Sequence, residues 1–388
     1  MTMRCTPRTA TSMAILLIAL VGCSERAKRS DEKRSPAVID PPVDISDTLE
    51  KVRARADLPA IAGAVWRGPS LAAIGASGAR KLGDSTRVTT DDKWHLSSDT
   101  KAMTATLIGI HVDRGRIHFE DTIGALFAGE TIDPGYADVT LDELLHHRGG
   151  VPADIPADVW SKMWSDGDAP GARLDAVRAI LSRPPARPPG TFEYSNAGYM
   201  IAGTALERAT GASWEQLLQK ELFAPLHMSS CGFGPPGAPG RVDQPRGHTI
   251  GAGGVATPVE PGPQADNPPA LGPAGTVHCS LADWGKFLAV HLAGARHEAT
   301  GLIAQATLTR LQTPAPGGDY ACGWIVTERP WAGGTALTHS GSNTLWFATV
   351  WLAPARNLAF AVVTNRGDQV ATAAVDSAFL PLLDSFAR

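Results

Sequence analysis

The 388-residue chain lacks an excess of positive charge, and its composition is not biased toward any special class. The formal net charge is −4, so the surface has no basic footprint of the kind that attracts a phosphate backbone. We therefore expect no nucleic-acid partner. With 43% hydrophobic and 19% charged residues, the chain resembles an ordinary globular protein with a large core in one or two domains.

No apolar run at the N-terminus is long enough to form a stable membrane anchor. Arg4 and Arg8 precede an apolar stretch from Met13 to Leu20, which is the pattern of an export signal. The stretch ends in Leu20-Val21-Gly22-Cys23, which resembles the lipobox of bacterial lipoproteins. We expect residues 1–22 to be a signal peptide and Cys23 to carry a lipid anchor, which implies a periplasmic or cell-surface lipoprotein. The alternative is a plain secreted protein that is cleaved nearby.

Cysteine is scarce, with five residues in the whole chain. Cys5 and Cys23 belong to the N-terminal segment, which leaves Cys231, Cys279 and Cys322 in an oxidising compartment. Their wide spacing has no CxxC pattern, so we expect buried small hydrophobic residues rather than a disulfide framework or a zinc site. The pair His146 and His147 also lacks a further ligand at metal-binding spacing. We expect neither a metal nor a cofactor.

The remaining chain reads as a flexible tether over residues 23–45 and a folded domain over residues 46–388. Strand-like runs lie near both ends of this domain, and residues 116–275 form an inserted region of helices followed by a long Gly- and Pro-rich loop. This order predicts an α+β fold, with an antiparallel sheet from N- and C-terminal strands, flanked by helices, and an inserted mainly helical subdomain. The expected strands are 61–66, 71–76, 320–326, 336–339, 346–352 and 358–364, and the main expected helices are 49–56, 103–112, 141–146, 174–181, 197–209, 214–223, 281–292 and 370–379.

Ser98 and Lys101 form the first chemical motif. Their i, i+3 spacing at the start of a predicted helix puts the hydroxyl and the amine on one face, about one turn apart. Serine needs an adjacent base to act as a nucleophile, and an amine kept neutral by burial can be that base. Ser-x-x-Lys is a weak signal alone, because it also occurs at Ser30 to Lys33 in the tether, where no helix is expected.

Tyr194-Ser195-Asn196 is the second motif. It follows the rigid turn Pro189-Gly190, which would present Tyr194 from a loop. A phenol close to cationic groups can shuttle protons near neutral pH. The Asn196 amide can orient either a substrate amide or Lys101. Taken alone, a tyrosine such as Tyr194 is more often a core aromatic residue with a satisfied hydroxyl.

The third motif is His339-Ser340-Gly341-Ser342, at the end of a predicted strand. Gly341 lets a substrate approach the backbone closely. If this strand end faces Ser98, the backbone N–H groups of Ser98 and Ser342 could form an oxyanion hole. Asn343 comes next, either as a substrate contact or as a turn residue.

In this order and at these separations, the three motifs resemble the serine β-lactamase and penicillin-binding-protein superfamily. More narrowly, the chain is similar to the class C β-lactamase group, which includes family VIII esterases, DD-peptidases and D-aminopeptidases. The likeness runs from about residue 46 to the C-terminus. It is supported by the phrases at 144–152, Pro273-Ala274-Gly275 and Gly323-Trp324, and it implies a β-lactamase/transpeptidase-like fold.

The resemblance also implies roles for these residues. Ser98 would be the acylated nucleophile, Lys101 its proton partner and Tyr194 the general base and acid. Asn196 would be a ligand of a substrate amide, and His339 stands at a substrate-binding position. From the third motif we also expect Gly341, Ser342 and Asn343 to bind substrate.

His339 departs from the lysine that β-lactamases of this group carry, and a histidine is only partly charged near neutral pH. We therefore expect a serine hydrolase that acts through an acyl-enzyme on ester or amide bonds, and we favour a peptidase or esterase. Its expected substrates are small-molecule or peptidoglycan-like, such as D-amino peptides and small esters. A class C-like β-lactamase and a receptor that stays acylated are the alternatives. We expect a monomer.

Overall fold

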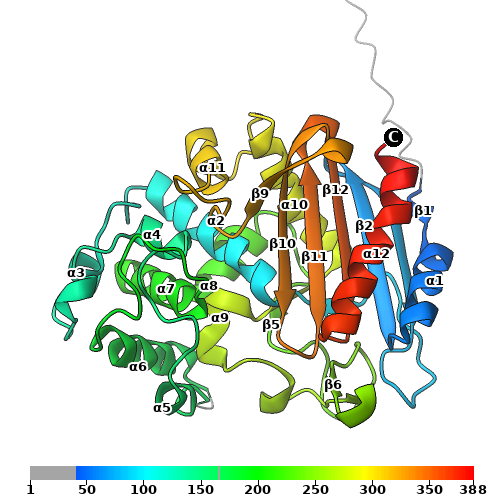
Figure 1. The fold of residues 1–388 in the computed structure, drawn as a ribbon, viewed down its shortest axis with the longest axis horizontal. Coiled ribbons are helices and arrows are strands. Elements are labelled where there is room, and N and C mark those ends of the chain that lie inside the picture. Colours follow the sequence, from blue (N-terminus) through cyan, green and yellow to red (C-terminus); the bar gives the residue numbers. More distant parts are fainter. Residues whose placement is uncertain (1–40, 165–166) are drawn as a thin grey trace, which may run out of the picture. The chain divides into compact units, whose positions relative to one another are not determined.

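The computed structural model describes residues 41–164 and 167–388, and within them a mixed α+β fold is built around one large sheet (Figure 1). The predicted signal peptide, Cys23 and most of the predicted tether lie outside the described residues. The sheet has seven strands in the order β1-β3-β2-β12-β11-β10-β9. The bounds are β1 (Val43–Asp44), β2 (Ala60–Arg67), β3 (Ser70–Gly78), β9 (Ile325–Arg329), β10 (Gly334–Ser342), β11 (Phe347–Ala353) and β12 (Leu358–Thr364).

The two ends of the folded chain meet in the middle of this sheet. β2 pairs antiparallel with β12, in a register that runs from Ile61 opposite Thr364 to Arg67 opposite Leu358. Every other pair in the sheet is antiparallel except β1 with β3. The predicted fold class, with a sheet assembled from N- and C-terminal strands, is therefore confirmed.

Helices cover both faces of the sheet, which explains why the strands are nearly continuous apolar runs. α1 (Ser46–Ala56) and α12 (Gln369–Phe386) pack against each other and against one face, where they form a separate apolar cluster. α10 (Leu281–Ala295) packs against β2 and β12 and belongs to the main core. Figure 1 shows α12 crossing the sheet beside α1.

A helical region lies beside the sheet and makes up most of the chain between β4 and β8 (Figure 1). α2 is buried along nearly its whole length, because it runs between this region and the sheet. The N-terminal end of α2 therefore lies where the helical region and the sheet meet. The helices are α2 (Thr100–Asp113), α3 (Ile123–Leu126), α4 (Leu141–Leu145), α5 (Ala157–Trp160), α6 (Ala169–Leu181), α7 (Asn196–Thr210) and α8 (Trp214–Leu218), which continues into a π-helical turn, η3 (Gln219–Phe223).

A small second sheet connects the start of α2 to the Gly- and Pro-rich segment. It contains β4 (Lys93–His95), β8 (Val277–Ser280) and β5 (Gly232–Phe233) in the order β4-β8-β5. The sequence did not predict these strands, nor α11 (Gln305–Leu311). In the segment 232–275, which was expected to be a loop, the hairpin β6 (His248–Ile250) with β7 (Ala256–Pro258) and the short helix α9 (Gly272–Gly275) also form.

The strand expected at 320–326 is wrong over most of its length. Tyr320 to Trp324 form a tight turn in which the Ala321 N–H donates to the Trp324 carbonyl at 2.7 Å, and strand β9 begins only at Ile325. Gly323 has a positive φ of 84°. A Cβ at this glycine would lie 2.5 Å from the Ala102 backbone nitrogen. These residues are apolar because they pack against the start of α2, not because the chain is extended.

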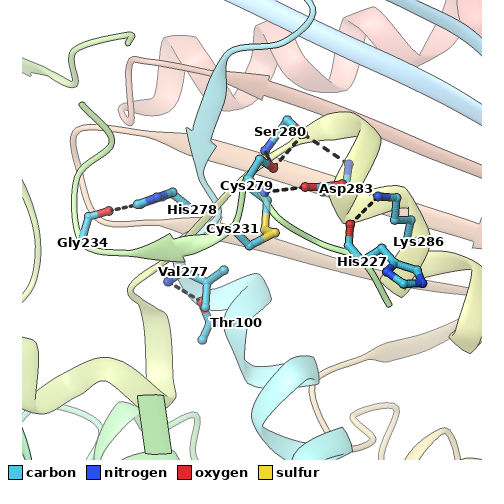
Figure 2. Close-up of a disulfide and its surroundings, with 11 residues drawn as sticks. Thr100, His227, Cys231, Gly234, Val277, His278, Cys279, Ser280, Asp283 and Lys286 are labelled. Carbon is cyan, nitrogen blue, oxygen red and sulfur yellow. Dashed lines mark hydrogen bonds and ion pairs between the residues drawn. A yellow bond between two sulfur atoms is a disulfide. The ribbon is translucent and has the colours of Figure 1, made fainter. Parts of the chain in front are cut away.

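The expectation for the cysteines is also wrong in part, because Cys231 and Cys279 form a disulfide (Figure 2). β5 pairs antiparallel with β8, with Gly232 opposite His278. This register places Cys231 opposite Cys279, with a Cα–Cα distance of 4.2 Å. The 48-residue separation hid a cross-strand pair whose strands had not been predicted. Cys322 is a free, buried thiol, as expected.

Within residues 41–164 and 167–388, no helix combines the length and the apolar character needed to cross a membrane.

Candidate active site

Ser98 and Lys101 meet at the N-terminal end of α2. Ser98 lies in a single 3₁₀ turn, η1 (Ser97–Asp99), which leads directly into α2. The Lys101 Nζ donates a hydrogen bond to the Ser98 Oγ at 3.0 Å. The i, i+3 spacing therefore brings the amine and the hydroxyl together as the sequence predicts.

Lys101 is completely buried, and polar groups surround its amine. Besides Ser98, the Nζ donates to the Asn196 Oδ1 at 2.7 Å and to the Ala274 carbonyl at 2.8 Å. Burial lowers the pKa of Lys101 to about 7, against a smaller opposing effect of the Asp99 charge. The amine can therefore be either charged or neutral near neutral pH, as a proton acceptor requires.

Tyr194 reaches the same point from the segment before α7. Its phenol interacts with the Ser98 hydroxyl, and the Lys101 Nζ lies 4.8 Å from the centre of its ring. Burial raises the pKa of Tyr194, so the phenol is protonated at neutral pH. Three groups from two distant segments thus converge.

His147 supports Tyr194 from the side. The two rings lie 4.2 Å apart between centres, and the His147 Nδ1 accepts a hydrogen bond from the Ser195 N–H at 3.1 Å. Burial lowers the pKa of His147 well below its usual value, so its ring is neutral. His146 instead bonds the backbone and Asp142. Among residues 41–164 and 167–388, no three His, Cys, Asp or Glu side chains are placed to hold a metal ion.

The end of β10 lies directly against the Ser98 turn. A Cβ at Gly341 would lie 2.1 Å from the Leu96 carbonyl oxygen and 2.7 Å from the Ser98 nitrogen, so only glycine allows this approach. The third motif therefore faces Ser98. This is the juxtaposition that an oxyanion hole from the Ser98 and Ser342 N–H groups requires.

His339 lies on β10 between two polar partners. Its Nδ1 is 3.2 Å from the Asp99 Oδ1, and its Nε2 is 3.1 Å from the Tyr320 hydroxyl. Burial raises the pKa of Asp99, and the hydrogen bond to His339 opposes that shift. No sequence motif singled out Asp99, yet it is a buried partner of His339.

Asn343 uses both ends of its amide within the protein. Its Oδ1 accepts from the Leu345 and Trp346 N–H groups, and its Nδ2 donates to the Asp266 Oδ1 at 3.0 Å. These contacts favour the turn-forming alternative over a substrate contact.

Cavities lie next to this cluster. One of about 410 Å³ contains residues of the second and third motifs, and it is lined by Phe192, Tyr194, Asp319, Tyr320, Ile325, Thr338, His339 and Ser340. A second, of about 290 Å³, is mostly apolar, and its lining includes Thr276 and Asp266, whose carboxylate contacts His95. Its other lining residues are Trp164, Ala169, Glu215, Phe233, Gly234, Pro235, Gly262, Pro263, Asn267 and Pro269.

Sequence reasoning missed several residues of this centre. The Ala274 carbonyl belongs to a phrase that supported the resemblance, but backbone acceptors leave no signal in side chains. Tyr320 lies in the segment that was expected to be a strand. His95, which contacts Ser97, and Asp266, which contacts His95, belong to no recognised motif.

Comparison with known proteins gives three findings. A family model described as "Beta-lactamase" matches residues 45–383. "Penicillin-binding protein 4" of Amycolatopsis lactamdurans is 28% identical over 328 residues, which cover 80% of this chain and 82% of that protein. Two solved structures share the fold at lower identity.

The first is an octameric penicillin-binding protein homologue from Pyrococcus abyssi, with a TM-score of 0.72 and 21% identity over 87% of this chain and 76% of that one. The second is a D-amino acid amidase from Ochrobactrum anthropi SV3, with a TM-score of 0.68 and 22% identity over 87% of this chain and 95% of that one.

Proposed function

The chain belongs to the beta-lactamase family, and from that premise we propose that it is a serine hydrolase that cleaves ester or amide bonds through an acyl-enzyme on Ser98. The observation that carries this proposal is the contact of a buried amine, Lys101, with the Ser98 hydroxyl at 3.0 Å, beside the Tyr194 phenol. Nucleophilic catalysis by serine needs a hydroxyl, a base that can accept its proton near neutral pH and a group that relays protons.

In the proposed acylation, the Ser98 Oγ attacks the substrate carbonyl and its proton moves to the neutral Lys101 Nζ. The N–H groups of Ser98 and Ser342 stabilise the oxyanion. The tetrahedral intermediate then breaks the bond to the leaving group, which receives a proton from Lys101 through Tyr194. Water attacks the acyl-enzyme by the same path in reverse, and releases the acid and the free Ser98.

We assign the role of base to Lys101 rather than to Tyr194. Burial raises the pKa of Tyr194 and lowers that of Lys101 to about 7, so at neutral pH the amine accepts a proton far more readily than a phenolate can form. Tyr194 then acts as a neutral relay. Its predicted role as general acid is kept.

The surroundings of His339 favour D-amino amides, peptides or small esters over β-lactams. A β-lactam carboxylate calls for a fixed positive charge, whereas His339 is already engaged by Asp99 and Tyr320. The D-amino acid amidase among the structural relatives supports the same substrate class. The alternatives remain a class C-like β-lactamase and a receptor that stays acylated.

Export to an oxidising compartment also remains our proposal. The Cys231–Cys279 disulfide supports it, because such bonds persist mainly outside the cytosol. The lipid anchor on Cys23 and the monomeric state stay predictions.

The test is the variant Ser98→Ala, assayed with p-nitrophenyl acetate, D-phenylalanine amide and nitrocefin. We expect at least about a thousandfold loss of kcat on whichever substrate the wild-type protein turns over. Intact mass should show a fluorophosphonate adduct on the wild type and none on the variant. Unchanged turnover in a folded Ser98→Ala protein would remove the assignment, and a β-lactam adduct that never decays would favour the receptor.

A further inference from the structure

The residue before Ser98 has an unusual backbone conformation. Ser97 has φ of 49°, in the left-handed region that residues other than glycine seldom adopt. This conformation fixes the direction of the next peptide group, whose N–H belongs to Ser98. Something must hold it there, because a serine does not select this region by itself.

His95 holds Ser97. The Ser97 N–H donates to the His95 Nδ1 at 3.1 Å, and the Ser97 Oγ lies 3.0 Å from the same atom. Since a backbone N–H donates to Nδ1, that nitrogen carries no proton. The proton of the ring therefore lies on Nε2.

Asp266 fixes this form of the His95 ring. The Asp266 Oδ2 is 2.7 Å from the His95 Nε2, and both side chains are buried, with exposures of 5% and 0%. Its other oxygen, Oδ1, accepts from the Asn343 Nδ2 at 3.0 Å and from the Asn267 N–H at 2.7 Å. Both Asp266 carboxylate oxygens therefore accept hydrogen bonds within the protein.

Asn343 carries the connection to the other side of Ser98. It follows Ser342 directly, and its Oδ1 orders the turn by accepting the Leu345 and Trp346 N–H groups. A continuous chain of hydrogen bonds therefore runs from Ser97 through His95 and Asp266 to Asn343. Its two ends are the residue before Ser98 and the residue after Ser342.

We propose that His95, Asp266 and Asn343 are positioning residues. They fix the position of the Ser98 N–H relative to the Ser342 N–H, and so shape the oxyanion hole. They do not touch the substrate. They act through the two peptide groups at the ends of the network. This inference rests on the proposed function, because it requires that Ser98 be acylated.

The Asp266→Asn variant tests the network with little change in shape. An amide has one acceptor atom where the carboxylate has two, so it leaves either His95 or the pair Asn343 and Asn267 facing another donor. Asn343→Asp creates the opposite fault, because it sets two carboxylates against each other while keeping the acceptor that orders the turn. We expect each variant to lower kcat for p-nitrophenyl acetate about ten- to hundredfold, with KM within about threefold of the wild type.

The double variant Asp266→Asn/Asn343→Asp exchanges donor and acceptor at this contact. The amide at 266 can accept from His95 and donate to the carboxylate at 343, so complementarity is restored at this contact, and only the Asn267 N–H then loses its acceptor. We expect kcat to recover at least about tenfold over the poorer single variant, a coupling that a merely structural role would not produce. Glu260→Gln, on the same segment but outside the network, is the matched control and should stay within about twofold of the wild type.

A second comparison uses two substitutions of His95. Both remove the imidazole, but only one of them keeps an acceptor for the Ser97 N–H. His95→Asn retains an oxygen that can accept from the Ser97 N–H, whereas His95→Leu does not, so we expect the Asn variant to be at least about fivefold faster in acylation by a fluorophosphonate. This comparison stands even if an Asp266 or Asn343 variant fails to fold. Equal rates for the two His95 variants, unchanged single variants or a double variant without recovery would overturn the proposal.

Failure of the underlying function is distinguishable from these outcomes. If the wild-type protein neither hydrolyses the ester nor labels on Ser98, the proposed function fails and the positioning role fails with it. If the wild type reacts normally and the network variants do too, only the positioning role is lost.

Discussion

The two sides of Ser98 are built in different ways. On one side, Lys101 and Tyr194 contact the Ser98 hydroxyl and carry the groups that can move a proton. On the other, His95, Asp266 and Asn343 never reach that hydroxyl and instead bond the segments that flank the two N–H groups. One side supplies chemistry and the other supplies geometry. Substitutions on the two sides should therefore fail in different ways.

The largest effect is expected on the chemical side, from Lys101→Arg. Arginine keeps a positive charge and hydrogen-bond donors but cannot lose a proton in this pH range, so it cannot accept the Ser98 proton. We expect kcat for p-nitrophenyl acetate to fall about a thousandfold or more. Lys286→Arg, where an exposed lysine pairs with the buried Asp283, is the matched control and should leave kcat unchanged.

An activity within about tenfold of the wild type in a folded Lys101→Arg protein would contradict the base assignment. Lys101 would then not be the base on the chemical side of Ser98, because another group would have to accept the Ser98 proton.

A smaller loss is expected on the geometric side, from Gly341→Ala. A Cβ at this position would lie 2.1 Å from the Leu96 carbonyl oxygen, so β10 must move away from the Ser98 turn. We expect kcat to fall about ten- to hundredfold with little change in KM, because the oxyanion donors separate while Lys101 is untouched.

The control for this substitution is Gly251→Ala. Its φ is −83°, and the nearest atom to a new Cβ is the Val255 carbonyl oxygen at 3.8 Å, so it should have no effect on kcat. A Gly341→Ala protein as active as this control would show that the approach of β10 does not limit the reaction.

The same division explains what the sequence could and could not predict. Ser98 and Lys101 lie one helical turn apart, so local spacing was enough to propose that they meet. Tyr194 and His339 were placed beside them by the resemblance of their short ordered motifs to a known family. The pairing of N- and C-terminal strands followed from where the β-rich runs occur. These features depend on neighbours in the sequence or on a pattern shared with known families.

The geometric side had no such signal. His95 and Asp266 are 171 residues apart, and they meet because His95 lies on β4, which pairs with β8, and the segment after β7 brings Asp266 to it. Strands of three and four residues are too short for periodicity to reveal. The disulfide was missed for the same reason, because its register depends on β5 and β8. Tertiary contacts, rather than local preference, fix these residues.

The smallest and most discriminating effect is a shift in the pH profile of acylation. Lys101 must be neutral to accept a proton, and its pKa is lowered to about 7. The rate of Ser98 labelling should therefore fall about tenfold per pH unit below this value and level off above it.

Asp99 and Asp266 give the two sides a matched pair of substitutions in this profile. The Asp99 charge raises the pKa of Lys101, so Asp99→Asn should lower that pKa and move the midpoint of the profile toward acid by up to about one unit. Asp266→Asn also removes one buried carboxylate, but it acts on geometry. It should lower the plateau of the profile and leave the midpoint in place. If both variants move the midpoint equally, Asp266 acts through charge on Lys101, and the separation between a chemical and a geometric side of Ser98 does not hold.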